Sequence, residues 1–159
     1  MRGVPLITRL ALPLVLALAF LPACAWRSHL SGLVDPPRHL RLYDGTRVRL
    51  RLDEESEPIR YLQGCVVRVE GNKFGPLFSV KDWYVEDAGF GYGAFVGRLR
   101  VVGTRALVDD RRTNTTLVLD PVSAIRLRAY DGLVVLIVGP LVGPSEVQAM
   151  SWRVLAEVE

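Results

Sequence analysis

GCVVRVEGNKFGPLFSVKDWYV, residues 64–85, indicates an internal repeat, because a related stretch, GLVVLIVGPLVGPSEVQAMSWRV, recurs at residues 132–154. An offset of 68 residues aligns three glycines and one proline of the two stretches, beginning with Gly64 and Gly132. One inserted residue then aligns Trp83 with Trp152. A repeat of this kind sets the architecture of the whole chain. We therefore expect two copies of one structural unit.

Both stretches show the alternation of a strand with one buried face. The residues sharing that face are Cys65, Val67 and Val69 in the first copy, and Leu133, Val135 and Ile137 in the second. A Gly–Pro turn follows in each, at residues 75–76 and 143–144. The next strand then breaks its alternation between Val80 and Trp83, and at the same place in the second copy, which indicates a β-bulge or bend. Because two faces and one irregularity match, duplication is the better interpretation.

Length and composition restrict the chain to one or two small domains. It has 159 residues, of which 50% are hydrophobic and 23% charged. Of the 20 Lys and Arg residues, Arg2 and Arg9 lie in the first 23 residues, which leaves 18 basic against 17 acidic residues. A nearly neutral remainder has little general attraction for phosphate backbones, so we do not expect a nucleic-acid partner.

The first 23 residues have the pattern of a signal peptide. Arg2 and Arg9 accompany an apolar run at residues 10–21, which is too short to span a bilayer comfortably. Leu21-Pro22-Ala23-Cys24 resembles the lipobox of bacterial lipoproteins. The resemblance implies that Cys24 is lipidated and becomes the mature N-terminus.

An anchored protein would need a spacer between the lipid and the fold. Residues 24–38 lack periodicity, and we expect them to form this tether. Ala25, rather than aspartate, after the cysteine implies an outer-membrane lipoprotein that faces the periplasm. The alternative is ordinary cleavage after Ala25, which would give a secreted or periplasmic protein.

Three strands and a short helix are expected ahead of the second copy of the repeat. The strands are Phe95–Val102, Arg105–Asp109 and Thr115–Asp120. A helix follows within residues 120–132, where Asp120 can cap, Pro121 suits the first helical position and Gly132 can end the segment. Three strands, a helix and two strands is the order of the OB-fold, a small five-stranded barrel.

A second pattern supports this likeness. Leu127, Gly132, Val135, Ile137 and Gly139 are spaced in a way that resembles the junction between the helix and the fourth strand of bacterial OB-fold proteins. The resemblance implies a mostly β protein with two tandem OB-fold-like barrels, at residues 39–88 and 95–159, joined by a connector at 89–94. The start of the first barrel is degenerate, and only Leu30–Val34 could supply its first strand. The alternative is a single β-sandwich.

An arginine row is the first candidate binding surface. Arg47, Arg49 and Arg51 alternate with apolar residues, so they should share the solvent face of one strand. Such a face could bind phosphates or acidic sugars. The alternative is a solvated face whose charge is neutralised by the acidic residues that follow, at positions 53–57.

The connector is the second candidate. Phe90 and Tyr92 alternate with glycines between the two barrels, and Phe95 follows. Aromatic rings on such a loop could stack on a sugar, a base or a peptide. They could also fill the interface between the barrels, which is the interpretation we favour.

Nothing in the sequence forms a catalytic constellation. His29 and His39 have no Cys or Glu at ligand spacing, so no metal or other cofactor is expected, and Cys65 is expected to be a small buried hydrophobe. We predict a non-catalytic envelope lipoprotein that binds or scaffolds an envelope protein or glycan. The alternative is an OB-fold binder of an oligosaccharide or nucleic acid.

Overall fold

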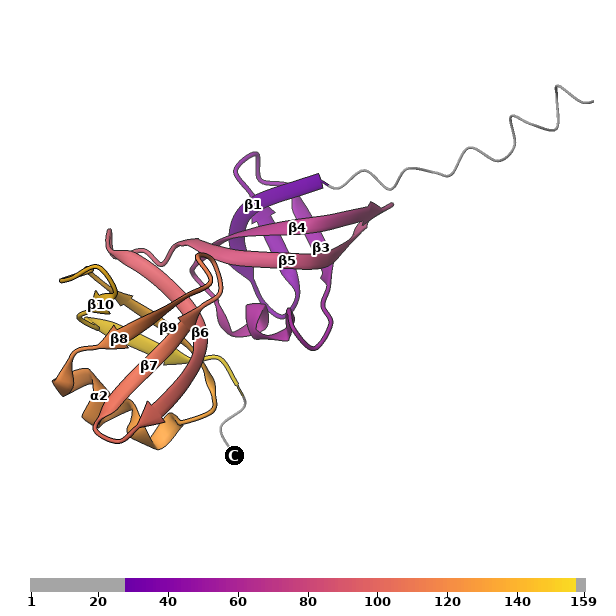
Figure 1. The fold of residues 1–159 in the computed structure, drawn as a ribbon. Helices are drawn as coiled ribbons and strands as arrows, with labels where there is room; N and C mark the ends of the chain where they lie inside the picture. Colours follow the sequence, from indigo (N-terminus) through magenta and orange to yellow (C-terminus); the bar gives the residue numbers. More distant parts are fainter. Residues whose placement is uncertain (1–27, 157–159) are drawn as a thin grey trace, which may run out of the picture.

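The chain is mostly β, with two curled sheets that lie side by side and one short α-helix (Figure 1). The computed structural model describes residues 28–156. The expected signal peptide and Cys24 lie outside this range. We call residues 28–87 the first unit and residues 93–156 the second unit.

The first unit is a closed barrel. Its elements are β1 (Ser28–Asp35), β2 (His39–Leu42), β3 (Arg47–Arg51), the 3-10 helix η2 (Glu57–Tyr61), β4 (Val66–Phe74) and β5 (Leu77–Asp87). β1 pairs with both β2 and β4, and β3 pairs with β5 in parallel, which closes the ring of strands. Because these five strands close on themselves, they do not form one sheet of a single β-sandwich, which was the alternative.

β1 corrects the expected tether at residues 24–38, because residues 28–35 of that segment form a barrel strand. The alternation of Leu30 and Val34 is interrupted by Gly32, which hid the strand pattern in the sequence. Gly32 is needed there, since a Cβ at this position would lie 2.5 Å from the carbonyl oxygen of Arg41 on β2. The glycine permits close pairing and removes the apolar signal.

The second unit repeats this order. Its elements are β6 (Gly93–Val102), β7 (Arg105–Asp110), β8 (Thr115–Leu119), α2 (Pro121–Leu127), the 3-10 helix η3 (Arg128–Tyr130), β9 (Val134–Gly139), β10 (Glu146–Val147) and β11 (Ser151–Val154). They form a 6-stranded sheet in the order β10-β8-β7-β6-β9-β11, in which β8 pairs with β10 in parallel. The three expected strands correspond to β6, β7 and β8, and the expected helix begins at α2.

The repeated stretches share their strand register. The matched pairs are Val67–Val85 with Val135–Val154, and Val69–Trp83 with Ile137–Trp152. A Cβ at Gly71 would lie 1.9 Å from the carbonyl oxygen of Ser79 on β5, and a Cβ at the aligned Gly139 would lie 1.9 Å from that of Gln148, between β10 and β11. Beside Gly71 the β4–β5 ladder shifts its register, while the second unit divides the same strand into β10 and β11. The expected irregularity is therefore present in both copies, as a register shift in the first and as a break between two strands in the second.

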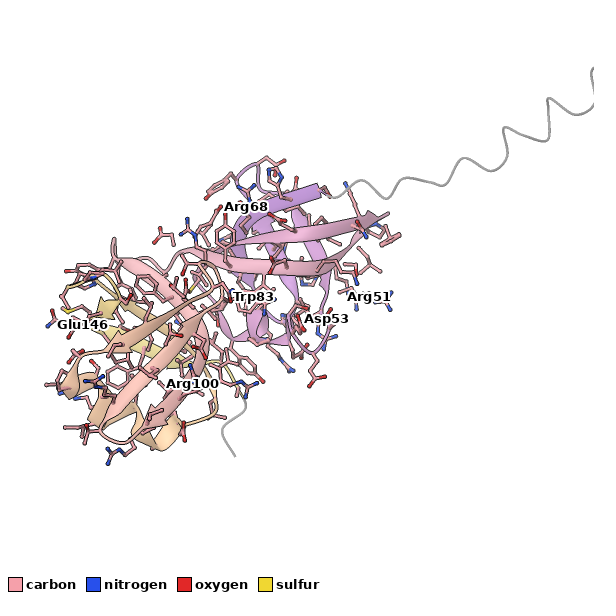
Figure 2. All side chains as sticks on the ribbon, viewed as in Figure 1. Arg51, Asp53, Arg68, Trp83, Arg100 and Glu146 are labelled. Atoms are coloured by element: carbon pink, nitrogen blue, oxygen red, sulfur yellow. The ribbon has the colours of Figure 1, made fainter. Side chains whose placement is uncertain are left out.

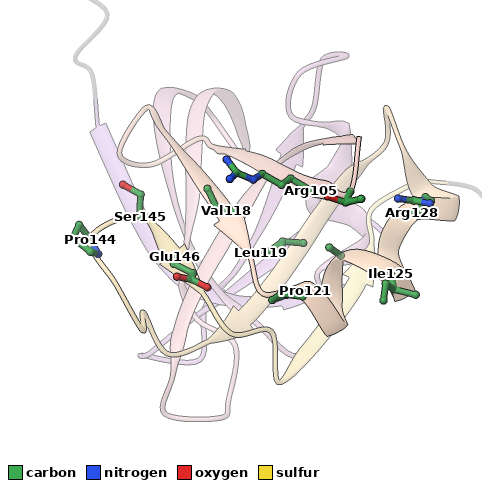
Figure 3. A pocket seen from close by; sticks show the side chains of 11 residues that line it. Arg105, Val118, Leu119, Pro121, Ile125, Arg128, Pro144, Ser145 and Glu146 are labelled. Carbon is green, nitrogen blue, oxygen red and sulfur yellow. The ribbon is translucent and has the colours of Figure 1, made fainter. Parts of the chain in front are cut away.

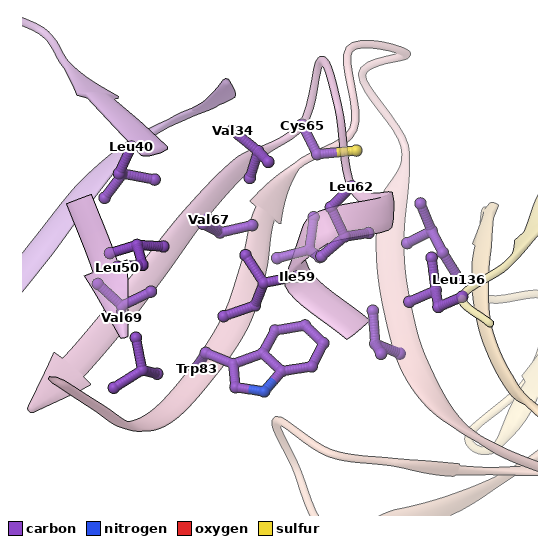
Figure 4. Close-up of a cluster of buried hydrophobic side chains, with 14 of the residues drawn as sticks. Val34, Leu40, Leu50, Ile59, Leu62, Cys65, Val67, Val69, Trp83 and Leu136 are labelled. Carbon is purple, nitrogen blue, oxygen red and sulfur yellow. The ribbon is translucent and has the colours of Figure 1, made fainter. Parts of the chain in front are cut away.

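The two units also share a core. Val135 and Ile137 of β9 pack inside the second unit, whereas Leu136 and Val138 on the opposite face of β9 join the core of the first unit. Figure 4 shows Leu136 beside the apolar side chains of the first barrel. Arg153 adds hydrogen bonds to the carbonyl oxygens of Tyr61 and Gln63, at 2.9 and 3.0 Å. β9 is thus buried on both faces because its side chains pack in two cores.

Candidate functional site: the outer face of the first barrel

The arginine row lies on the outer face of β3, as its alternation predicts. Arg47, Arg49 and Arg51 are all exposed, while Leu50 between them is buried. Arg47 Nη2 lies 2.6 Å from Asp35 Oδ2. Within residues 28–156, Arg49 and Arg51 have no carboxylate at ion-pair distance. Two cations of the row are therefore free to meet an anion.

The acidic residues that follow β3 do not neutralise the row. Asp53 Oδ1 accepts hydrogen bonds from the backbone N–H and the hydroxyl of Ser56, at 3.0 and 2.6 Å. The hydrogen bond from the Ser56 hydroxyl is the main reason that the pKa of Asp53 lies below its ordinary value. Glu57 pairs instead with two other arginines, Arg38 and Arg60. The first turn after β3 uses these carboxylates for its own structure, so the arginine charge remains.

A hollow of about 330 Å³ adjoins Arg51 on the same face. Three neighbouring strands form its floor, because Arg51 of β3 pairs with Ser79 of β5, which pairs with Asn72 of β4. The residues lining it are Arg51, Leu52, Asp53, Asn72, Phe74, Ser79, Val80 and Lys81. Figure 2 shows Arg51 and Asp53 on the part of the barrel away from the second unit.

The lining contains groups that can bind an acidic sugar beside one carboxylate, Asp53, whose Oδ1 is already engaged by Ser56. The cations of Arg51 and Lys81 can bind a carboxylate or sulfate, and the amide of Asn72 and the hydroxyl of Ser79 can bind ring hydroxyls. Phe74 is 60% exposed and offers an apolar face to a sugar ring. The sequence singled out the arginines but not these partners, since a parallel β3–β5 pairing brings them together.

The second unit provides an internal comparison for this face. Arg49 pairs with His39 and Leu77, and the corresponding ladder position is Val118, which pairs with Leu107 and Glu146. By the same register, Thr116 stands where the first unit has Arg47, and Asp120 where it has Arg51. The matching strand pairings of the second unit therefore form without arginines at these positions.

The connector does not fill the interface between the units, so the interpretation that we favoured is wrong for its two rings. Phe90 and Tyr92 are 60% and 48% exposed. Gly89 and Gly91 both have positive φ, at 84° and 70°, and turn the backbone sharply on either side of Phe90. Phe95 is half-buried and packs on the core of the second unit. The interface is built instead by the outward face of β9.

A larger hollow, of about 740 Å³, lies on the second unit between α2, β7, β8 and the segment before β10 (Figure 3). Its floor is mainly apolar and its rim carries Arg105, Arg128 and Glu146. Arg128 is already held, since its Nη2 donates to the carbonyl oxygen of Gly103 at 2.9 Å. The hollow offers few converging polar groups, unlike the face beside Arg51.

The part of the chain that the structure describes contains no group of three or more His, Cys, Asp or Glu residues arranged for a metal ion. None of its helices has the length and apolar composition to cross a membrane. Cys65 is buried, as expected, and burial raises the pKa of its thiol. The chain matches no family model, and no curated protein or solved structure matches it at a significant level.

Proposed function

We propose that the protein is a non-catalytic binding module of the bacterial cell envelope, and that the outer face of its first unit binds an acidic polysaccharide. The observation that carries this proposal is the pair of unpaired arginines, Arg49 and Arg51, at positions where the duplicated unit has Val118 and Asp120. Exposed charges add little to stability, so these two arginines are available to a ligand.

We further propose that each unit is an OB-fold. Its third strand pairs in parallel with its fifth, and its first strand pairs with the second and fourth, as in β1 to β5 of the first unit. A short helix stands between the third and fourth strands of each unit. OB-folds bind oligosaccharides and oligonucleotides on the face of strands 2 and 3, and the arginine row lies on strand 3 of the first unit.

Among anionic chains, an acidic polysaccharide fits better than a nucleic acid. The basic residues beyond the expected signal peptide are nearly balanced by acidic ones, so the charge is local to one face. The hollow beside Arg51 offers hydroxyl-binding groups and one exposed ring, Phe74. A glycan ligand also suits an envelope location, which rests on the lipobox resemblance of residues 21–24.

The test is the affinity of the purified mature chain for an oligogalacturonate, measured by isothermal titration calorimetry. The double variant Arg49→Ser/Arg51→Ser should lose about tenfold or more in affinity while retaining its melting temperature. The matched control is Arg105→Ser/Arg126→Ser, which removes two exposed charges from the second unit. Equal losses in both variants, or none in the first, would overturn the proposal.

The envelope location has its own test at Cys24. Intact mass of the protein from the membrane fraction should show Cys24 as the first residue with added acyl chains. The lipid would anchor the chain without a spanning helix. A mature N-terminus at Trp26 with no acyl mass would show ordinary cleavage and would contradict a lipid anchor.

A further inference from the structure

A third hollow, of about 250 Å³, lies between the two units. The first unit contributes Trp83 and Pro58 to its lining, and the second contributes Asp110, Arg111 and Asn114. Figure 2 shows Trp83 on the side of the first barrel that faces the second unit. Ligand sites are common at such junctions, and this volume suits a molecule smaller than a typical drug.

Asp110 presents an unsatisfied oxygen in this hollow. The residue is 2% exposed. Its Oδ2 accepts hydrogen bonds from the backbone N–H and the hydroxyl of Thr113, at 3.0 and 2.6 Å, which fixes the carboxylate. Its Oδ1 is buried and has no hydrogen-bond partner among the described residues. A buried acceptor without a donor is unfavourable, so this oxygen is suited to a donor that arrives with a ligand.

Arg111 supplies the complementary donor. Its guanidinium stacks over the ring of Trp83, 5.2 Å from the ring centroid, and its Nη2 lies 3.3 Å from Asp82 Oδ1. These contacts hold the side chain across the junction between the units. Its Nε is buried and has no acceptor within the described part of the chain. Adjacent residues therefore present one free acceptor and one free donor, each held by other contacts.

A hydroxyl group can donate to Asp110 Oδ1, and a ligand oxygen can accept from Arg111 Nε. An anion is disfavoured by the carboxylates of Glu55, Asp109 and Asp110, which also line the hollow. The apolar lining from Trp83, Pro58 and Val134 suits the C–H face of a sugar ring. We propose that the junction between the units binds a neutral sugar ring through one of its hydroxyls.

This site is independent of the arginine row, because it recognises an uncharged ligand with different residues. The informative variant is Asp110→Asn, which keeps one oxygen for Thr113 and replaces the free oxygen with an NH₂ group. Arg111→Lys is the second variant, because lysine retains the positive charge but has no Nε donor at that position. Arg49→Ser/Arg51→Ser serves as the matched control on the other face.

The experiment measures saturation-transfer NMR and calorimetric binding of glucose and N-acetylglucosamine to the mature chain. Wild type and the Arg49→Ser/Arg51→Ser control should bind at least one of these sugars equally. Asp110→Asn should weaken that binding by about tenfold or more, the effect of losing one hydrogen bond to a charged group. Its melting temperature without sugar should stay close to that of wild type, because the variant keeps the oxygen that accepts from Thr113.

Two results would overturn the inference. One is a wild type that binds neither neutral sugar, which would mean that Asp110 Oδ1 and Arg111 Nε do not bind a sugar. The other is Asp110→Asn and Arg111→Lys variants that bind as wild type does. Loss of oligogalacturonate binding in the Arg49→Ser/Arg51→Ser variant, with neutral sugar binding intact, would show that the two sites are separate.

Discussion

At the scale of single residues, Gly71 and Gly139 are two aligned positions where the two units tolerate little change. A Cβ at either would lie 1.9 Å from a backbone carbonyl oxygen, that of Ser79 or of Gln148. Alanine at each position should therefore lower the free energy of unfolding by about 1–3 kcal/mol, as for other overpacked sites. Urea denaturation measures this, and Gly143→Ala, whose nearest contact would be 3.4 Å away, is the control. Equal stability of all three variants would contradict the close approach.

Asp120 is a second residue whose local role can be measured. Its carboxylate caps α2 by accepting from the N–H groups of Val122 and Ser123, both at 3.1 Å, and it also accepts from the N–H of Ala149. Burial raises the pKa of Asp120, but the hydrogen bonds from Ser123, Ala149 and Val122 outweigh burial and lower it from the ordinary value of 3.8.

The pH dependence follows from that direction. Since the pKa of Asp120 is lower in the folded chain than in the unfolded chain, its contribution is present above the ordinary value of 3.8 and is lost as pH falls through the folded value. Asp120→Ala should cost about 0.5–2 kcal/mol at neutral pH and less in acid. Asp120→Asn should keep most of the cap without this pH dependence. Urea midpoints across acidic pH measure both, and parallel curves for wild type and Asp120→Asn would contradict the assignment.

At the scale of elements, the connector at residues 89–94 is expected to contribute little to stability. Phe90 and Tyr92 are largely exposed, so Phe90→Ser/Tyr92→Ser should change the free energy of unfolding by less than about 0.5 kcal/mol. Phe95→Ser is the control from the same segment, because Phe95 packs on the second core and its loss should cost about 2 kcal/mol. A large loss of unfolding free energy in the double variant would show that the connector does contribute to the interface.

The elements also show what a sequence can predict here. The repeat predicted two matching copies, and the pairings of β4 with β5 and of β9 with β11 match, because alternation and glycine spacing are encoded locally. β1 was largely hidden, since Gly32 replaces an apolar residue where the strands approach closely. The lining of the hollow beside Arg51 could not be predicted, because Asn72, Ser79 and Lys81 reach it only through the parallel pairing of β3 with β5.

The interface between the two units also depends on tertiary packing that the sequence pattern does not specify. The continuous apolar run of β9 is compatible with a strand buried on both faces, but alternation alone does not say what covers the second face. The structure shows that Leu136 and Val138 on that face join the core of the first unit.

At the scale of the whole molecule, the shared core should make the two units unfold together. Leu136→Ala/Arg153→Ala removes an apolar contact and the hydrogen bonds to Tyr61 and Gln63. We expect wild type to give one calorimetric transition and the variant to give two, with a total loss of about 2–5 kcal/mol. Leu99→Ala, inside the second core alone, should lower stability without separating the transitions. Two transitions already in wild type would contradict a cooperative interface.

The central claim is that the first unit, and not its duplicate, binds an acidic polysaccharide on the outer face of its third strand. The most direct measurement is a titration of the ¹⁵N-labelled mature chain with an oligogalacturonate, followed by backbone amide chemical shifts. We expect the largest chemical-shift changes at Arg49, Arg51 and Ser79, and little change at the corresponding residues Val118 and Gln148. Changes centred on the second unit, or no saturable change at all, would contradict it.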